Sequence, residues 1–251
     1  MLQRQTIDED MDETGNDNEQ DAFEVQREQM HRQMLSAVSH DLKTPLASVI
    51  GSLEIYQRMS ANLSEAKRAI LIQTALSEAY RLDSFLTNIL DMAKLESNLL
   101  PFKDEEIDVR NLLENVVNGL GMRAQEAKIS ITSAEQNFTI HLDIALASRA
   151  LGLLVDNAVK HAGPHPVVDI DYRRLGDLLV ITINDNGDGI PDGKEEEIFS
   201  KYSRLRRGDH QNAGTGLGLA IARLVARRLG GDVTVKNRTE GGAQFTFTCD
   251  I

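Results

Sequence analysis

Apolar residues recur every three or four positions over residues 24–97, which is the period of an amphipathic helix. The repeat forms two stripes, separated by a polar turn at 60–63. The stripes consist of Leu35, Val38, Leu42, Pro45, Val49, Leu53 and Tyr56, and of Ile72, Ala75, Ala79, Leu82, Leu86, Ile89 and Ala93. We therefore predict two long helices joined as an antiparallel hairpin, with Asn62 and Glu65 as a capping box at the second helix.

A single hairpin leaves much of each apolar stripe uncovered, because two helices bury only the surfaces that face each other. Pairing of two hairpins removes the remaining apolar surface from water. We therefore expect a homodimer in which two α-helical hairpins form a dimeric four-helix bundle.

The pattern changes after Pro101, where short apolar runs alternate with helical segments in the manner of a mixed α/β domain. Helices are expected at 109–127, 144–162 and 215–229, and strands at 129–132, 138–142, 167–172, 178–185, 232–237 and 244–249. We place a helical domain at 24–100 and an α/β domain at 101–251. An acidic leader over 1–23 precedes them and is too polar to fold by itself.

Charge and composition limit the classes of partner and the cellular location that we expect. A net charge of −12 repels nucleic acid and anionic membranes, so neither is expected as a partner. One cysteine, Cys249, excludes an intrachain disulfide and fits a reducing compartment. No apolar run approaches the ~18 residues of a membrane span. We expect a cytoplasmic location, with membrane attachment only through a sensor region absent from this chain.

His40 is the first candidate catalytic residue. On a helix it lies about 160° from both Val38 and Leu42, so its ring faces away from the apolar stripe. An exposed imidazole attacks the γ-phosphate of ATP when one ring nitrogen is free and a carboxylate, here Asp41, accepts its proton. Pro45 loosens the helix beside it. The alternative is an ordinary surface histidine.

A second group of residues has the chemistry of a nucleotide site. Asn157 and Lys160 share one helix face, where an amide oxygen ligates Mg²⁺ and an ammonium meets phosphate. Asp185 ends an apolar strand and offers a carboxylate to an adenine amino group, while Gly187 and Gly189 allow close backbone approach.

A third segment, 214–219 (Gly-Thr-Gly-Leu-Gly-Leu), opens a predicted helix whose N–H groups and dipole favour phosphate. Each of these segments alone has an ordinary explanation as a turn, a close-packed helix cap or a chance pair.

Together and in this order, the three segments resemble the N, G1 and G2 boxes of the Bergerat-type ATPase superfamily. The run His-Asp-Leu-Lys-Thr-Pro at 40–45 resembles the phosphoacceptor box of sensor histidine kinases of two-component systems. The resemblance covers about residues 30–251. It implies an α/β sandwich of the Bergerat-type ATP-binding fold and an enzyme, a protein histidine kinase with ATP and Mg²⁺ as cofactors. It also implies that His40 passes its phosphoryl group to an aspartate on the receiver domain of a response regulator.

The resemblance also assigns roles. Residues 199–204 are similar to the F box, in which Arg204 reaches the γ-phosphate. Asp41–Thr44 is similar to a pattern tied to dephosphorylation of the regulator, with Thr44 orienting a water. Asn157 is the implied metal ligand. Nucleotide binding is implied for Asn157, Lys160, His161, Asp185, Gly187, Gly189, Thr215, Gly216, Leu217 and Gly218.

The chain departs from the family pattern at three positions. Leu153 stands where the kinases usually carry a first Asn, His161 where many carry Tyr, and Ala213 where Gly is frequent. Two other readings therefore stay open: an ATPase of the same superfamily without histidine transfer, and a dimeric scaffold that only binds partners.

Overall fold

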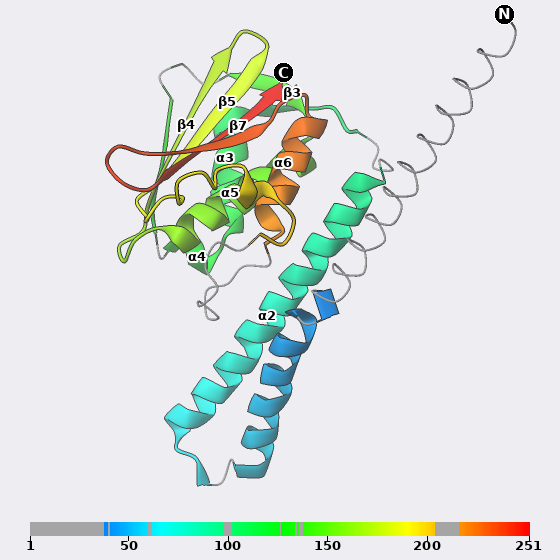
Figure 1. Ribbon diagram of the computed structural model, residues 1–251, viewed down its shortest axis with the longest axis vertical. Helices are drawn as coiled ribbons and strands as arrows, with labels where there is room; N and C mark the ends of the chain where they lie inside the picture. The colour runs from blue at the N-terminus through cyan, green and yellow to red at the C-terminus, as the bar shows by residue number, and fades with distance from the viewer. Residues whose placement is uncertain are drawn as a thin grey trace, which may run out of the picture. The chain divides into compact units, whose positions relative to one another are not determined.

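The computed structural model describes residues 38–39, 41–59, 62–97, 102–125, 127–133, 135, 138–203 and 216–251. The chain divides into two compact units between Ser84 and Phe85. The predicted hairpin is present: residues 41–59 are helical, and helix α2 (Glu65–Glu96) follows and crosses the boundary between the two units (Figure 1). The N-cap differs from the prediction, because Ser64 Oγ, not Asn62, accepts the N–H of Lys67 at 3.4 Å.

The hairpin leaves a broad apolar surface exposed. Ala75 is buried, but large side chains on both helices are 41–64% exposed. They are Leu46, Ile50, Leu53, Ile55, Met59, Ile70, Ile72 and Leu76. Leu53 and Ile72 belong to the predicted stripes, so the pairing of the two helices does not cover these stripes fully.

The second unit is built on a five-stranded sheet with the order β2-β4-β5-β7-β6, in which β2 pairs parallel to β4 and the other neighbours are antiparallel. Its strands are β2 (Lys128–Thr132), β4 (Val167–Leu175), β5 (Leu178–Asp185), β6 (Val233–Asn237) and β7 (Ala243–Asp250). A separate pair joins β1 (Glu105–Asp108) to β3 (Thr139–Leu142). Its helices are α3 (Val109–Gly119), α4 (Met122–Gln125), α5 (Ile144–His161), the short 3₁₀ helix η2 (Glu197–Phe199) and α6 (Gly218–Arg228).

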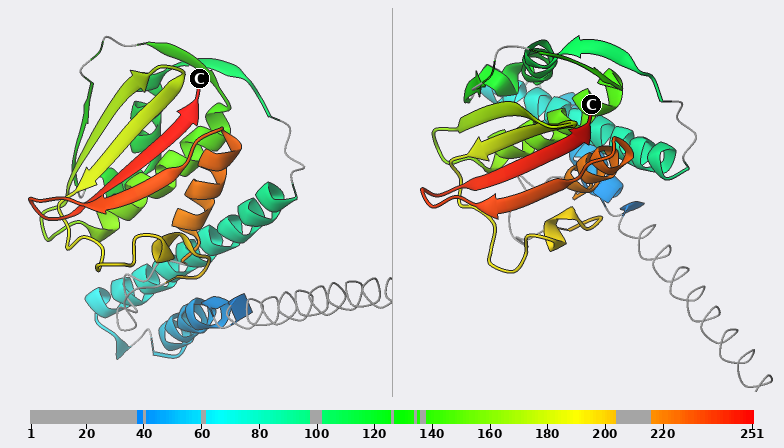
Figure 2. Two further views of the ribbon diagram at one scale, coloured as in Figure 1. Left: turned by 45° about the horizontal axis from the view of Figure 1, so that its top comes forward. Right: turned by 90° about the horizontal axis from the view of Figure 1, so that it is seen from above.

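Helices α3, α5 and α6 cover one face of this sheet (Figures 1 and 2). Alternate residues of β7 are buried beneath them, as the two-residue period of a strand requires. Tyr172, Phe245 and Phe247 are the largest fully buried side chains of the core. Burial within this sheet raises the pKa of Cys249 to about 12, so its thiol stays protonated.

The predicted α-helical hairpin followed by an α/β sandwich is thus confirmed, with three local corrections. The helix expected at 109–127 is two helices, because Gly121 between them adopts φ of +60°. The helix expected from 215 begins at Gly218, since Gly216 has φ of +68°. Strand β1 was missed because its sequence, Glu-Glu-Ile-Asp, carries almost no apolar signal.

No helix in the described part of the chain is both long enough and apolar enough to cross a membrane.

Candidate nucleotide-binding site

Asp185 is the best-defined polar group of the site. It ends β5, whose apolar residues fill the core, and is only 2% exposed. Its Oδ1 accepts the N–H of Gly187 at 2.9 Å and the N–H of Ala243 at 3.1 Å. Among the described residues, no donor reaches Oδ2. The carboxylate is therefore held in one orientation, with one oxygen left for a donor on a ligand.

We call residues 185–191 the nucleotide loop. This loop begins at Asp185 and packs on the end of α5. A Cβ on Gly187 would lie 2.0 Å from the carbonyl oxygen of His161, so only glycine fits there. Gly189 adopts φ of +75°, which a side chain would disfavour. Both glycines of the predicted motif are thus required by geometry, and His161 contributes its backbone to the site.

Helix α5 presents the other predicted contacts. Its capping by Asp143, whose Oδ1 accepts the N–H of Leu146, agrees with the sequence prediction. Asn157 is half-buried, and no described residue hydrogen-bonds its side chain. Lys160 Nζ lies 2.6 Å from Asp156 Oδ2, which leaves other N–H donors of the ammonium group for a phosphate.

Sequence reasoning assigned no role to Asp156. Burial alone would raise the pKa of Asp156, but the charges and hydrogen bonds of Lys160 and Arg123 outweigh burial and lower it. Arg123 Nη1 lies 2.5 Å from Asp156 Oδ1. One ionised carboxylate therefore holds both Arg123 and Lys160.

The start of α6 lies against α5. A Cβ on Gly218 would be 3.5 Å from Leu153 Cδ2, so the departure at Leu153 is an apolar contact between the two helices. Gly216 accepts the N–H of Tyr202 at 2.9 Å and leaves no room for a side chain. Leu217 is the N-cap residue of α6, and its apolar side chain forms no capping hydrogen bond. Gly216 and Leu217 thus precede the helix and Gly218 begins it, while their contact with phosphate stays a prediction.

Three predicted site residues, His40, Arg204 and Thr215, lie outside the described residues. Asp41 and Thr44 are on the helix of the hairpin, Asp41 half-buried and Thr44 exposed. Within the second unit, α5 brings together the nucleotide loop at His161 and the α6 start at Leu153.

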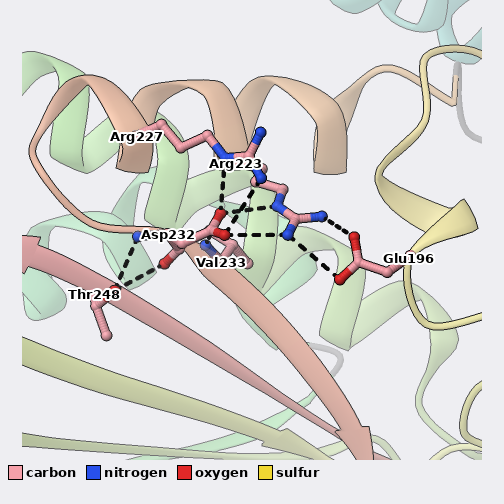
Figure 3. A network of polar contacts seen from close by, with 6 residues as sticks. All are labelled: Glu196, Arg223, Arg227, Asp232, Val233 and Thr248. Carbon is pink, nitrogen blue, oxygen red and sulfur yellow. Dashed lines mark hydrogen bonds and ion pairs between the residues drawn. The ribbon is translucent and has the colours of Figure 1, made fainter.

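The sequence analysis also missed a polar network around Arg223 (Figure 3). Arg223 of α6 lies 2.8 Å from Asp232 and 2.5 Å from Glu196, and its guanidinium stacks 4.7 Å from the ring centroid of Phe199. Arg227 also pairs with Asp232. The network ties α6 to β6 and to the segment before η2. The pairs of Arg223 join residues 9 and 27 positions apart, which no local pattern reveals.

We expect Asp232→Asn to lower the free energy of unfolding by about 1 kcal/mol at pH 7, a value reduced for solvent screening because the side chain is 37% exposed. Burial alone would raise the pKa of Asp232, but hydrogen bonds from Arg223, Arg227 and the N–H of Val233 lower it from 3.8 to about 2. A lowered carboxyl pKa stabilises the fold above pH 3.8, and this stabilisation is lost as the pH falls towards 2.

Urea unfolding of both proteins checks this prediction. The difference between wild type and Asp232→Asn should be full at pH 5 and about half as large at pH 3. An equal difference at both pH values would contradict it.

Two family models match the chain. His Kinase A (phospho-acceptor) domain matches residues 30–98, and Histidine kinase-, DNA gyrase B-, and HSP90-like ATPase matches residues 142–251. The chain is 36% identical over 234 residues to the sensor protein KdpD of Escherichia coli (strain K12). The match covers 92% of this chain but spans only 25% of KdpD.

Solved structures share the fold. The Acinetobacter baumannii histidine kinase AdeS superposes with a TM-score of 0.64 at 20% identity, covering 84% of this chain and 97% of AdeS. Histidine kinase ThkA, solved in complex with response regulator protein TrrA, gives a TM-score of 0.65 at 20% identity, covering 87% of this chain and 61% of that chain.

Proposed function

We propose that this chain, which belongs to the sensor histidine kinase family, phosphorylates itself on His40 with ATP and passes the phosphoryl group to a response regulator. The observation that carries the proposal is the buried Asp185, oriented by two backbone N–H groups beside the Gly187–Gly189 backbone and α5. A carboxylate held in this way accepts a hydrogen bond from the adenine amino group. A cytoplasmic location belongs to the same proposal, because ATP is available there.

Transfer of the phosphoryl group from ATP to His40 needs no reactant besides ATP and the protein. A ring nitrogen of His40 attacks the γ-phosphorus, the bond to the β,γ-bridging oxygen breaks, and ADP leaves with the electron pair. Asp41 accepts the imidazole proton. The phosphoryl group then moves to an aspartate oxygen on the receiver domain. Positioning and charge stabilisation provide most of the catalysis, for which Lys160 and Arg204 are the candidates.

Mg²⁺ fits the residues on α5. Among the described residues, no cluster of three or more His, Cys, Asp and Glu forms a metal site. A nucleotide-bound Mg²⁺ needs few protein ligands, because phosphate oxygens and waters complete its shell. Asn157 would supply one amide oxygen, and the ion would neutralise charge on the transferred group.

Incubation with γ-labelled ATP and Mg²⁺ tests the proposal. We expect label on the protein that is labile to acid and stable to alkali, as a phosphohistidine is. ATP hydrolysis without protein label would favour an ATPase without histidine transfer. No nucleotide binding would favour a scaffold that only binds partners.

We propose that the chain works as a homodimer through the helical hairpin. The support is the apolar surface that the hairpin leaves exposed, including Ile50, Leu53 and Ile72. We expect light scattering to give twice the chain mass at micromolar concentration, and Ile72→Glu to shift the protein towards monomer. The matched control, Gln73→Glu, changes an exposed polar neighbour and should leave the dimer intact. A monomeric wild type would refute the proposal.

We also propose that the chain removes phosphate from its regulator, with Thr44 orienting the attacking water. Thr44 is exposed on the helix, four residues after His40 and therefore one turn along the same face. Thr44→Ala should slow the decay of phospho-regulator roughly tenfold while autophosphorylation is largely kept. Thr44→Ser, which keeps the hydroxyl, is the control. Equal decay rates for wild type and folded Thr44→Ala would exclude this role.

A further inference from the structure

The nucleotide loop is held at both ends by one turn, the brace turn, which we define as residues 237–243 between β6 and β7. At the far end, the side-chain amide of Asn237 makes two hydrogen bonds with the backbone of Ile190. Its Oδ1 accepts the N–H of Ile190 at 2.7 Å, and its Nδ2 donates to the carbonyl of Ile190 at 2.7 Å. The amide thus pairs with the loop as a neighbouring strand would.

At the near end, the brace turn contacts Asp185. Arg238 Nη1 donates to the carbonyl of Asp185 at 2.8 Å, and the N–H of Ala243 donates to its carboxylate at 3.1 Å. A Cβ on Gly242 would lie 2.0 Å from the Asp185 carbonyl oxygen, so the two backbones are in close contact. The stretch between the two held ends contains Gly187 and Gly189, whose backbones have no side chains to restrict them.

We propose that Asn237 is a positioning residue for nucleotide binding: it holds the loop in the conformation that a base requires. This rests on the proposed function, since it concerns the same site. Flexible glycines lose conformational entropy when a ligand orders them, and a loop ordered in advance loses less. Asn237 acts through Ile190, so its loss weakens binding without removing a group that reacts.

Asparagine is suited to this role because its amide carries a donor and an acceptor side by side. Asn237→Ala removes both hydrogen bonds. Asn237→Asp keeps an acceptor for the Ile190 N–H but places a second acceptor against the Ile190 carbonyl. Both variants should therefore loosen the loop, and Asn237→Asp does so without removing side-chain volume.

The test is a titration of the full chain with ATP and with GTP, at a temperature well below the unfolding transition. The proteins are wild type, Asn237→Ala, Asn237→Asp and, as control, Lys236→Ala, which alters an exposed neighbour on β6. For both Asn237 variants the ATP dissociation constant should rise roughly five- to twenty-fold, as expected for one or two hydrogen bonds. The preference for ATP over GTP should fall, while autophosphorylation at saturating ATP stays within about twofold.

The outcomes separate this inference from the proposed function. If wild type binds ATP and both variants bind it with unchanged affinity, the positioning role is wrong. The role is equally wrong if the variants lose rate at saturating ATP while their ATP affinity is kept. If wild type binds no ATP, the proposed function itself fails.

Discussion

Replacing His40 with Gln should abolish autophosphorylation while ATP binding stays at the wild-type level. Glutamine keeps a polar side chain on the helix but has no ring nitrogen that can attack phosphorus. The proposed nucleotide contacts come from α5, β5 and α6, which belong to a different compact unit from residue 40. The variant should therefore lose phosphoryl transfer without losing ATP affinity. We expect its labelling to fall by at least about 1,000-fold.

The measurement is acid-labile label per chain after incubation with γ-labelled ATP, next to a nucleotide titration of the same samples. His31→Gln is the matched control, because His31 has no adjacent carboxylate and no following Thr-Pro. It should be labelled like wild type. Equal labelling of His40→Gln and wild type would show that another residue accepts the phosphoryl group.

Replacing Asp185 with Asn should weaken ATP binding by about 100-fold, which corresponds to about 3 kcal/mol. The N–H groups of Gly187 and Ala243 both point at Oδ1, so the amide oxygen of the variant must stay there. The amide nitrogen then takes the place of Oδ2. Its N–H would face the adenine amino N–H, and two donors cannot satisfy each other.

The same geometry predicts a change of base preference. Guanine carries an acceptor, O6, where adenine carries its amino group, so the variant should lose far less affinity for GTP than for ATP. Titration with both nucleotides measures the ratio. Asp192→Asn, which changes an exposed carboxylate just beyond the loop, is the control and should keep the wild-type ratio. A parallel loss of both affinities would mean that Asp185 supports the fold but does not contact the base.

Local sequence pattern predicts the secondary structure correctly wherever an apolar repeat ends at a clear polar signal. The strand predicted at 178–185 is β5 without any change of bounds, and the helix capped by Asp143 differs from α5 by one residue. In both cases a long apolar repeat ends at a polar residue, and this information is local. The order and spacing of the Asn, Asp-Gly and Gly-rich segments predict one nucleotide site. The structure shows that α5 contacts the nucleotide loop at His161 and the α6 start at Leu153.

The contacts that hold these groups depend instead on long-range folding. Lys160 pairs with Asp156, whose second cation comes from Arg123, 33 positions away. Asn237 binds the loop at Ile190 from 47 positions away, and Arg223 joins Glu196 to Asp232. A side chain's hydrogen-bond partner depends on which strands and turns become neighbours in space, and that is settled by burial of the whole core. Sequence pattern therefore predicts the reacting and binding groups, whereas folding determines the contacts that hold the described ones.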